Sequence, residues 1–319
     1  MITASTLITS QNLPIIDMHD EVEVAREQCF TNLIRPKVAD LLPEGRALPP
    51  LGAVLDLPCG QGTLVQDLAY EYPELEVAGV DVFPALMASN SAQARALSLI
   101  NASFGVVDLY QSPFDFSEAS FDLITASFLQ SRLQERDFPP LFAECARILK
   151  PGGWLRLVEC EAGRCTSGAV EELSLRYDQA VARAGLHPIP ANLAHDLDDR
   201  GALRAMLAEA DLPVSAVRRV TLDFSAHEAA NAPMQRVILV FFEQVKPFLL
   251  RMQMVSEEEY DALMRQAACE MSMLGFQGSW HLLVLWGQKS ASAGEIVQAM
   301  ASLRNGRGGE GNYVSSTSC

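Results

Sequence analysis

The sequence VLDLPCGQGT at residues 54–63 joins a short apolar run to the start of an amphipathic segment. Glycines at 60 and 62 stand where a chain turns tightly from a strand into a helix, or where backbone passes close to a ligand. The spacing is not that of a dinucleotide fingerprint, because Thr63 and Val65 occupy the positions three residues after these glycines. The stretch therefore predicts a strand-to-helix loop that holds a small nucleoside-containing cofactor rather than a pyrophosphate.

Residues 54–158 alternate short apolar runs with amphipathic segments, the pattern of a parallel sheet covered by helices on both faces. We expect strands at residues 54–57, 76–82, 104–107, 121–126 and 154–160, with helices between them. Beyond residue 160 the pattern predicts helical insertions at about 166–212 and 226–278, strands near 220–224 and at 280–286, and a helix with a Ser256–Glu259 capping box.

The two ends of the chain differ from this core. Residues 21–42 have a helical pattern that Pro36 interrupts, and a proline-containing linker follows. The last thirty residues carry too little apolar mass to offset the entropy of ordering. We therefore expect a helical N-terminal segment at 1–50, a cofactor-binding domain at 51–289 with the two insertions, and a mostly disordered tail at 290–319.

Acidic residues accompany the first three predicted strands. Asp56 ends the first, Asp81 ends the second 25 residues later, and Asp108 follows the third. Doubly wound folds place a carboxylate after the second strand, where it accepts hydrogen bonds from ribose hydroxyls. Three solvated surface acids are the alternative, which their common position at strand ends disfavours.

At these positions the chain resembles the class I S-adenosylmethionine-dependent methyltransferases. The family's acidic residue followed by hydrophobic-G-x-G-x-G matches residues 56–62, with Pro58 in place of the first glycine. FDLITAS at 121–127 resembles the fourth-strand motif, and LKPGGW at 149–154 resembles the turn before the fifth strand. The resemblance implies an α/β fold: a Rossmann-like, doubly wound sheet of seven strands with the last antiparallel, N-terminal helices and a helical cap.

The resemblance also implies the cofactor, S-adenosylmethionine, with Asp81 on its ribose and Asp108 on its adenine amine. Residues expected to bind it are Asp56, Pro58, Gly60, Gly62, Asp81, Val82, Asp108, Leu109 and Ser127. Proline has no N–H, so the loop cannot hold the cofactor through a donor at position 58. Loss of cofactor binding is the alternative that this proline leaves open.

Residues 147–161 and 278–289 resemble small-molecule methyltransferases of microbial secondary metabolism. The resemblance implies O-, N- or C-methylation of a small metabolite, and an insertion rich in Met and Phe favours an apolar or aromatic one. Two alternatives stay open. One is an enzyme of this fold that retains S-adenosylmethionine but catalyses a cyclisation or rearrangement, and the other is a catalytically silent protein that binds it.

A general base is needed only where the nucleophile is poorly ionised. His187 is the first candidate, because it lies in a cap segment, residues 185–190, expected to face the pocket. Glu161 is the second, together with Glu159, at the end of the fifth strand. Weaker candidates are His195, His227 and His281.

Composition limits the partners. A formal net charge of −16 disfavours nucleic acid, which is bound through cationic surface. The chain shows no targeting or membrane-spanning pattern, and its seven scattered cysteines form neither a C-x-x-C pair nor a zinc spacing. We therefore expect a cytoplasmic protein with a small-molecule substrate and no nucleic acid, membrane or metal partner, and with its oligomeric state open between monomer and homodimer.

Overall fold

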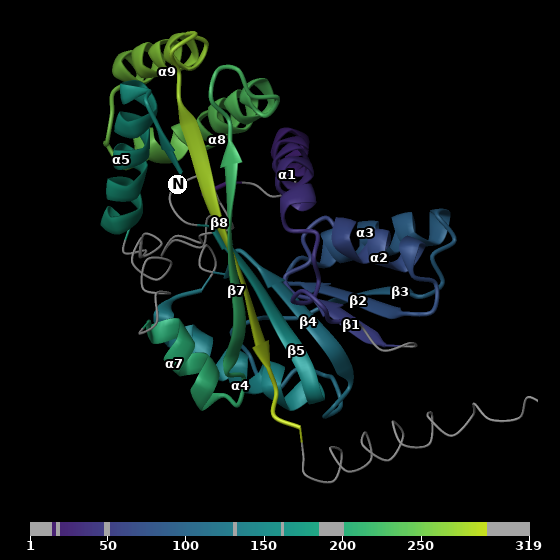
Figure 1. Cartoon of the computed structure of the whole chain (residues 1–319). Coiled ribbons are helices and arrows are strands. Elements are labelled where there is room, and N and C mark those ends of the chain that lie inside the picture. The colour runs from purple at the N-terminus through teal and green to yellow at the C-terminus, as the bar shows by residue number, and fades with distance from the viewer. Residues whose placement is uncertain are drawn as a thin grey trace, which may run out of the picture.

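The computed structural model describes residues 15–16, 20–47, 52–129, 133–160, 163–184 and 201–291. Its centre is one sheet of eight strands in the order β3-β2-β1-β4-β5-β8-β6, with β7 pairing along β8 (Figure 1). The strand order changes direction at β1, between β2 and β4. Ligands of open α/β sheets bind outside the carboxyl ends of the strands at such a point.

Five parallel strands form the half of the sheet that carries the glycine loop. They are β1 (Ala53–Asp56), β2 (Glu76–Asp81), β3 (Ala102–Val106), β4 (Phe121–Ser127) and β5 (Leu149–Cys160). The helices between them are α2 (Thr63–Glu71), α3 (Pro84–Ala96), the short η3 (Glu135–Asp137) and α4 (Phe138–Ile148). The predicted alternation of strands and helices is thus confirmed, with Asp108 two residues beyond the end of β3.

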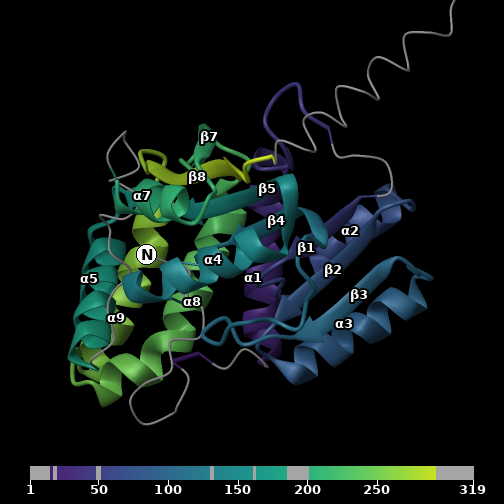
Figure 2. The ribbon, with the colours of Figure 1, turned by 90° about the horizontal axis from the view of Figure 1, so that it is seen from below.

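Helices cover both faces of the sheet. Apolar residues of α2 and α3, including Val65 and Met87, pack against Val54 and Leu123 on one face. On the other face, α4 and α7 (Ala202–Glu209) pack against a separate cluster that includes Leu55. Figure 2 shows α2 and α3 beside β1 to β3, and α4 beside β4 and β5. This arrangement confirms the doubly wound fold.

The far half of the sheet is antiparallel. The strand β8 (Gly278–Gln288) runs antiparallel to both β5 and β7 (Val214–Asp223), which confirms the expected direction of the last strand. A further strand, β6 (Arg164–Cys165), pairs with Gly278 and Ser279, so the sheet has eight strands where seven were expected. Two residues carry no alternating pattern, which is why the sequence did not predict β6.

A helical layer lies beyond the carboxyl ends of the parallel strands (Figure 1). It contains α5 (Gly168–Arg183), α8 (Asn231–Arg251) and α9 (Glu257–Met271), which pack around buried aromatic residues such as Phe241 and Trp280. The Ser256 hydroxyl accepts the N–H of Glu259 at 3.2 Å, and the Glu259 carboxylate accepts the N–H of Ser256 at 3.0 Å. The predicted capping box is thus confirmed.

The N-terminal segment joins this helical layer to the sheet. Helix α1 (Glu21–Ile34) packs against α8 and ends in a 3-10 turn, η1 (Arg35–Lys37), that contains Pro36. Residues 38–42, hereafter the strap, are not helical, so the predicted helical pattern is wrong beyond the proline. The indole N–H of Trp286 donates to Leu41 O at 2.9 Å, and this bond fastens the strap to β8.

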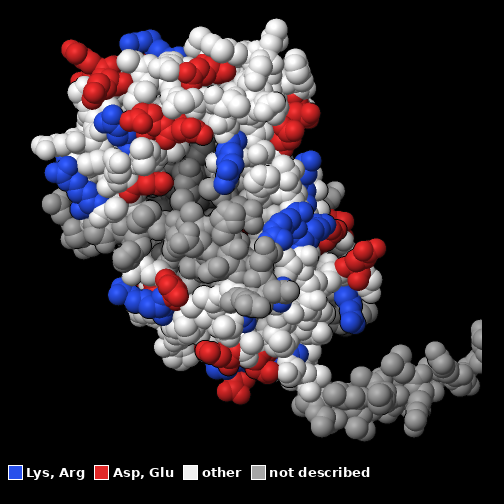
Figure 3. All heavy atoms as spheres, turned by 60° about the vertical axis from the view of Figure 1, so that its left-hand side comes forward, with Lys and Arg blue, Asp and Glu red and all other residues white. Residues whose placement is uncertain are grey.

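On the side of α5 and α9, the acidic and basic side chains of the described residues are interspersed, and neither kind forms a continuous charged patch (Figure 3). Within the described ranges, every helix is too short or too polar to cross a lipid bilayer.

Candidate functional site

Backbone hydrogen bonds to the neighbouring strands hold the loop after β1. The N–H of Leu57 donates to Thr125 O at 2.9 Å, and the N–H of Cys59 donates to Val80 O at 2.9 Å. Pro58, which follows a cis peptide bond, lies between these two anchored residues. Its missing N–H therefore interrupts neither bond.

The two loop glycines have different roles. Both adopt a positive φ, 50° at Gly60 and 69° at Gly62. A Cβ on Gly62 would lie 2.7 Å from Phe104 Cε1 and 2.9 Å from Asn90 Nδ2, so this glycine allows close packing against β3 and α3. A Cβ on Gly60 would meet no heavy atom within 4 Å. Gly60 therefore leaves open space for a ligand to approach its backbone.

Asp81, at the end of β2, fixes this loop. Its Oδ2 accepts the N–H of Gly60 at 3.0 Å, and its Oδ1 accepts the N–H of Val82 at 2.7 Å. Asn90 adds a third tie by donating to Gly60 O at 2.8 Å. The Asp81 side chain is fully buried. A ribose could reach this carboxylate only if the loop moves.

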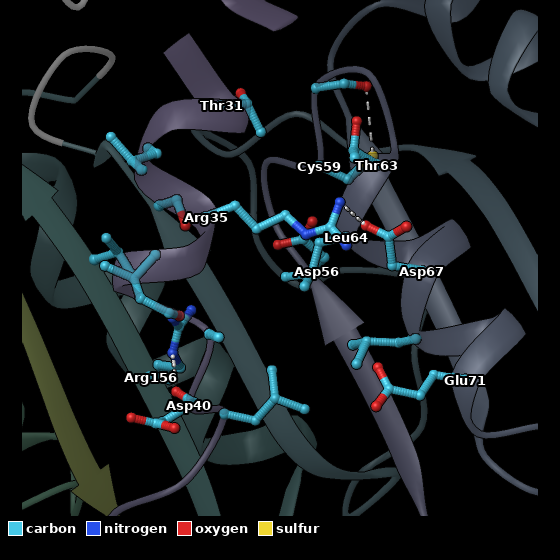
Figure 4. Close-up of a pocket in the computed structure, with 18 of the residues that line it drawn as sticks. Thr31, Arg35, Asp40, Asp56, Cys59, Thr63, Leu64, Asp67, Glu71 and Arg156 are labelled. Carbon is cyan, nitrogen blue, oxygen red and sulfur yellow. Dashed lines mark hydrogen bonds and ion pairs between the residues drawn. The ribbon is translucent and has the colours of Figure 1, made fainter. Parts of the chain in front are cut away.

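A cavity of about 820 Å³ opens between the glycine loop, α1, the strap and α2. Small-molecule sites have volumes of roughly 300–1,000 Å³, so this cavity is large enough for a nucleoside cofactor. Arg35, after the end of α1, reaches across to Asp67 on α2, with Nη1 and Oδ2 2.5 Å apart (Figure 4). Both residues line the cavity, so this ion pair joins two of its walls.

Asp56 is the buried acid of the cavity wall. Its side chain is 5% exposed, and no hydrogen bond among the described residues ends on its carboxylate. Burial raises the pKa of Asp56 to about 7, while Arg156 opposes that rise and Asp81 adds to it. A buried carboxylate without a partner is unfavourable. The cavity thus offers a binding position for a cation or a hydrogen-bond donor.

Two phenylalanines give the cavity wall apolar surface. Phe30 of α1 and Phe128 after β4 line the cavity with ring centroids 6.0 Å apart, and Phe30 also packs against Trp280 at 5.5 Å. Phe128 has a φ of 58°, which is rare for a bulky residue, and its N–H donates to Val158 O at 2.8 Å. Strained backbone of this kind is concentrated at ligand sites.

The structure divides the residues predicted to bind the cofactor. Those that line the cavity are Asp56, Pro58, Gly60 and Ser127. Gly62 and Asp81 support the loop from behind. Beyond the ends of β2 and β3, and outside this cavity wall, lie Val82, Asp108 and Leu109.

The carboxylate of Asp108 is hydrogen-bonded within its own turn. Its Oδ1 accepts the N–H of Tyr110 at 3.0 Å, and its Oδ2 accepts the side-chain N–H of Gln111 at 2.8 Å. An adenine amine would have to share or displace one of these bonds. The adenine contact therefore stays a prediction.

Neither predicted catalytic residue lies in the described part of the chain. His187 and Glu161 both fall outside it, as does His195. The described residues of the cavity wall include no histidine.

The weaker candidates have other contacts. Glu159, at the end of β5, is buried and accepts the N–H of Leu129 at 2.9 Å, so it holds the segment after β4. His281 on β8 contacts the Thr221 hydroxyl at 3.1 Å, and His227 is exposed. None of the three lines the described cavity wall.

Sequence reasoning missed Arg156, a cavity residue on β5 that is 3% exposed. Burial lowers the pKa of Arg156 to about 10, while attraction to Asp56 opposes that change. The sequence contains a signal for Arg156, because a cation inside the apolar run WLRLV of a central strand requires a buried partner.

Known proteins are similar to part of this sequence. Residues 54–153 match the protein family described as a methyltransferase domain. The chain is similar to the secondary metabolism regulator laeA of Monascus pilosus, with 29% identity over 179 residues, or 56% of this chain and 46% of that protein. It is also similar to the protein-methionine methyltransferase laeA of Emericella nidulans, with 30% identity over 48% of this chain and 40% of that protein. The chain spans less than half the length of these curated relatives.

A solved structure shows the same fold. Phosphoethanolamine N-methyltransferase 2 of Haemonchus contortus, in complex with phosphomonomethylethanolamine and S-adenosylhomocysteine, has a TM-score of 0.50 and 16% identity. The match covers 88% of this chain and 61% of that one.

Proposed function

Because residues 54–153 match the family described as a methyltransferase domain, we propose that the protein is an S-adenosylmethionine-dependent methyltransferase acting on a small, largely apolar or aromatic metabolite. One observation carries the proposal. The open backbone of Gly60 lines the same cavity as the carboxylate of Asp56, to which no described residue donates a hydrogen bond, and this cavity lies at the carboxyl ends of β1 and β4.

These residues fit the cofactor best at its amino-acid end. Asp56 would hold the ammonium group, which relieves a buried carboxylate of its missing partner. Gly60 and Ser127 would lie along the cofactor, and Asp81 would hold the ribose hydroxyls once the loop opens. When bound, S-adenosylmethionine supplies a methyl group that its sulfonium already activates.

The chain's own residues orient the nucleophile and exclude water, the two requirements of an in-line transfer. Phe30 and Phe128 offer the substrate an apolar wall, while α1 and the strap cover the cavity. A phenol or alcohol would also need a base, for which His187 and Glu161 remain the predicted residues.

Methionine in a protein is a second candidate substrate. It is favoured by the name of the Emericella nidulans relative, a protein-methionine methyltransferase. The two phenylalanines of the cavity wall support a small-molecule substrate instead, because they offer apolar surface inside a cavity of small-molecule size.

Methyl-labelled S-adenosylmethionine separates these possibilities. The purified protein is incubated with the label and a panel of apolar phenols, alcohols and amines, and the organic extract and the protein fraction are counted separately. We expect label in the extract. Label only in the protein fraction contradicts the small-molecule substrate, and product that needs the cofactor but carries no label identifies a cyclisation or rearrangement.

Calorimetric titration of S-adenosylmethionine tests the cofactor independently of any substrate. We expect the wild type and Ser256→Ala, a variant of a helix cap on α9, to bind equally well, because Ser256 lies outside the cavity wall. Asp56→Asn should bind at least about tenfold more weakly, because it loses the charge that faces the ammonium. A wild type that does not bind would overturn the proposed activity.

A further inference from the structure

A row of polar side chains crosses the sheet beneath the cavity. Asp56 on β1 is the register partner of Thr125 on β4, and Thr125 is the register partner of Arg156 on β5. Register partners in neighbouring strands point to the same face. All three side chains are buried on the face that α2 covers. The row therefore places a carboxylate, a hydroxyl and a guanidinium side by side in apolar surroundings.

Arg156 joins this row to the strap. Its Nη1 donates to the Thr125 hydroxyl at 2.9 Å, its Nε donates to Asp40 O at 3.0 Å, and its Nη2 donates to Val38 O. Figure 4 shows Arg156 and Asp40 in the same cavity as Asp56. One buried side chain thus contacts both the sheet and the cover of the cavity.

The charge of Arg156 acts on Asp56 without a direct hydrogen bond. Arg156 lowers the pKa of Asp56 against the larger effect of burial, and Asp81 on β2 raises it. The cavity is also lined by other charged groups: Arg26 and Glu27 of α1, Arg35 of η1, Asp40 of the strap, Arg46 after it, Asp67 and Glu71 of α2, and Glu74 before β2. Arg35 is paired with Asp67 and Arg26 with Glu23, and the cation that lowers the pKa of Asp56 is Arg156.

We propose that Arg156 is a positioning residue for the cofactor: its charge favours the ionised form of Asp56 that receives the ammonium group, and its hydrogen bonds tie the strap over the same cavity. The inference rests on the proposed function. Arg156 lies outside the glycine loop, and its charge determines the pH range over which Asp56 is ionised and the cofactor binds. Thr125 lies on the strand between the two charged residues, and its hydroxyl holds Arg156 in the row by accepting a hydrogen bond from it.

Arg218 provides a matched control. It also fastens the strap, through an ion pair with Asp40 and a hydrogen bond from Nη2 to Lys37 O at 3.2 Å. It lies on β7, and its side chain is 37% exposed, so it has no place in the polar row. Arg156→Met and Arg218→Met therefore both loosen the strap, but only the first removes the charge beside Asp56.

The experiment measures two quantities in the wild type and both variants. Carbon-detected NMR follows the ionisation of the Asp56 carboxyl in the ligand-free protein, and calorimetry gives the Kd of S-adenosylmethionine between pH 6 and 8.5. In Arg156→Met we expect the Asp56 midpoint to rise by roughly one pH unit or more, so that affinity near pH 6 falls roughly tenfold further than at pH 8.5. In Arg218→Met the midpoint should stay at its wild-type value.

An unchanged Asp56 midpoint in Arg156→Met overturns the inference, and so does an equal shift in Arg218→Met. Should Arg156→Met fail to fold, Thr125→Val removes the intervening hydroxyl at nearly constant volume, and it should raise the midpoint by a smaller amount. No shift in that variant also overturns the inference. A wild type that fails to bind the cofactor contradicts the proposed function alone, because the Asp56 midpoint is measured without ligand.

Discussion

Replacing Asp56 by asparagine should stabilise the ligand-free protein at neutral pH. Burial raises the pKa of Asp56 from 3.8 to about 7, a difference of about 3 pH units, and each unit corresponds to ~1.36 kcal/mol. The ionised side chain therefore costs about 4 kcal/mol of folding free energy above pH 7, a value that already includes the attraction of Arg156. Because the folded protein binds this proton more tightly than the unfolded chain, stability falls as pH rises from about 4 to about 7.

Urea unfolding at pH 5 and pH 8 measures this effect. Asp56→Asn should be the more stable protein at pH 8, and its advantage over the wild type should grow by about 2.5 kcal/mol between the two pH values. The same substitution should weaken cofactor binding, so a gain in stability accompanies a loss of affinity. A variant that is less stable than the wild type at pH 8, or an advantage that does not change with pH, would refute the account of Asp56 as a buried, unpartnered charge.

The loop glycines and the α9 cap give further predictions, each measured by urea unfolding and by calorimetric titration of S-adenosylmethionine. Gly60→Ala should cost only about 1 kcal/mol of stability, for its left-handed backbone, but should reduce affinity because the Cβ enters open space where the ligand approaches. Gly62→Ala should cost about 2–4 kcal/mol, because its Cβ collides with Phe104 and Asn90, and equal losses of stability at the two glycines would contradict their different roles. Ser256→Ala should cost about 1 kcal/mol with an unchanged Kd, and a weaker Kd would place α9 in contact with the cofactor site.

Local patterns explain why the parallel strands could be predicted. The central strands β1 and β4 are short apolar runs with side chains buried on both faces, and β1 and β2 end at residues that the sequence itself marks, Asp56 and Asp81. The capping box of α9 is equally local, since its two bonds join residues three apart. The sequence was less informative for β7, whose first half is mostly partly buried and does not alternate, and only residues 220–224 carried a clear pattern.

The site depends on contacts that local patterns do not encode. Arg156 and the strap residue Asp40 are 116 positions apart, and their contact depends on how β5 is placed in the sheet. The glycine loop was located correctly, but only the packing of Phe104 and Asn90 shows which glycine closes the turn and which faces the cavity. Asp81 likewise ends β2 as expected, yet its carboxylate accepts two backbone N–H groups that the sequence does not reveal.

The polar row explains why stability and binding are opposed at Asp56. A direct ion pair with Arg156 would satisfy the carboxylate and leave it no reason to attract a ligand cation. Thr125 stands between them instead, and the three donated bonds of Arg156 go to Thr125 and the strap. The guanidinium thus lowers the cost of ionising Asp56, while no described residue donates a hydrogen bond to its carboxylate oxygens. Arg156 makes the ionised form of Asp56 accessible, but it does not supply the hydrogen bonds that a bound ammonium group would donate to the carboxylate. The same substitution, Asp56→Asn, should therefore stabilise the ligand-free fold and weaken cofactor binding.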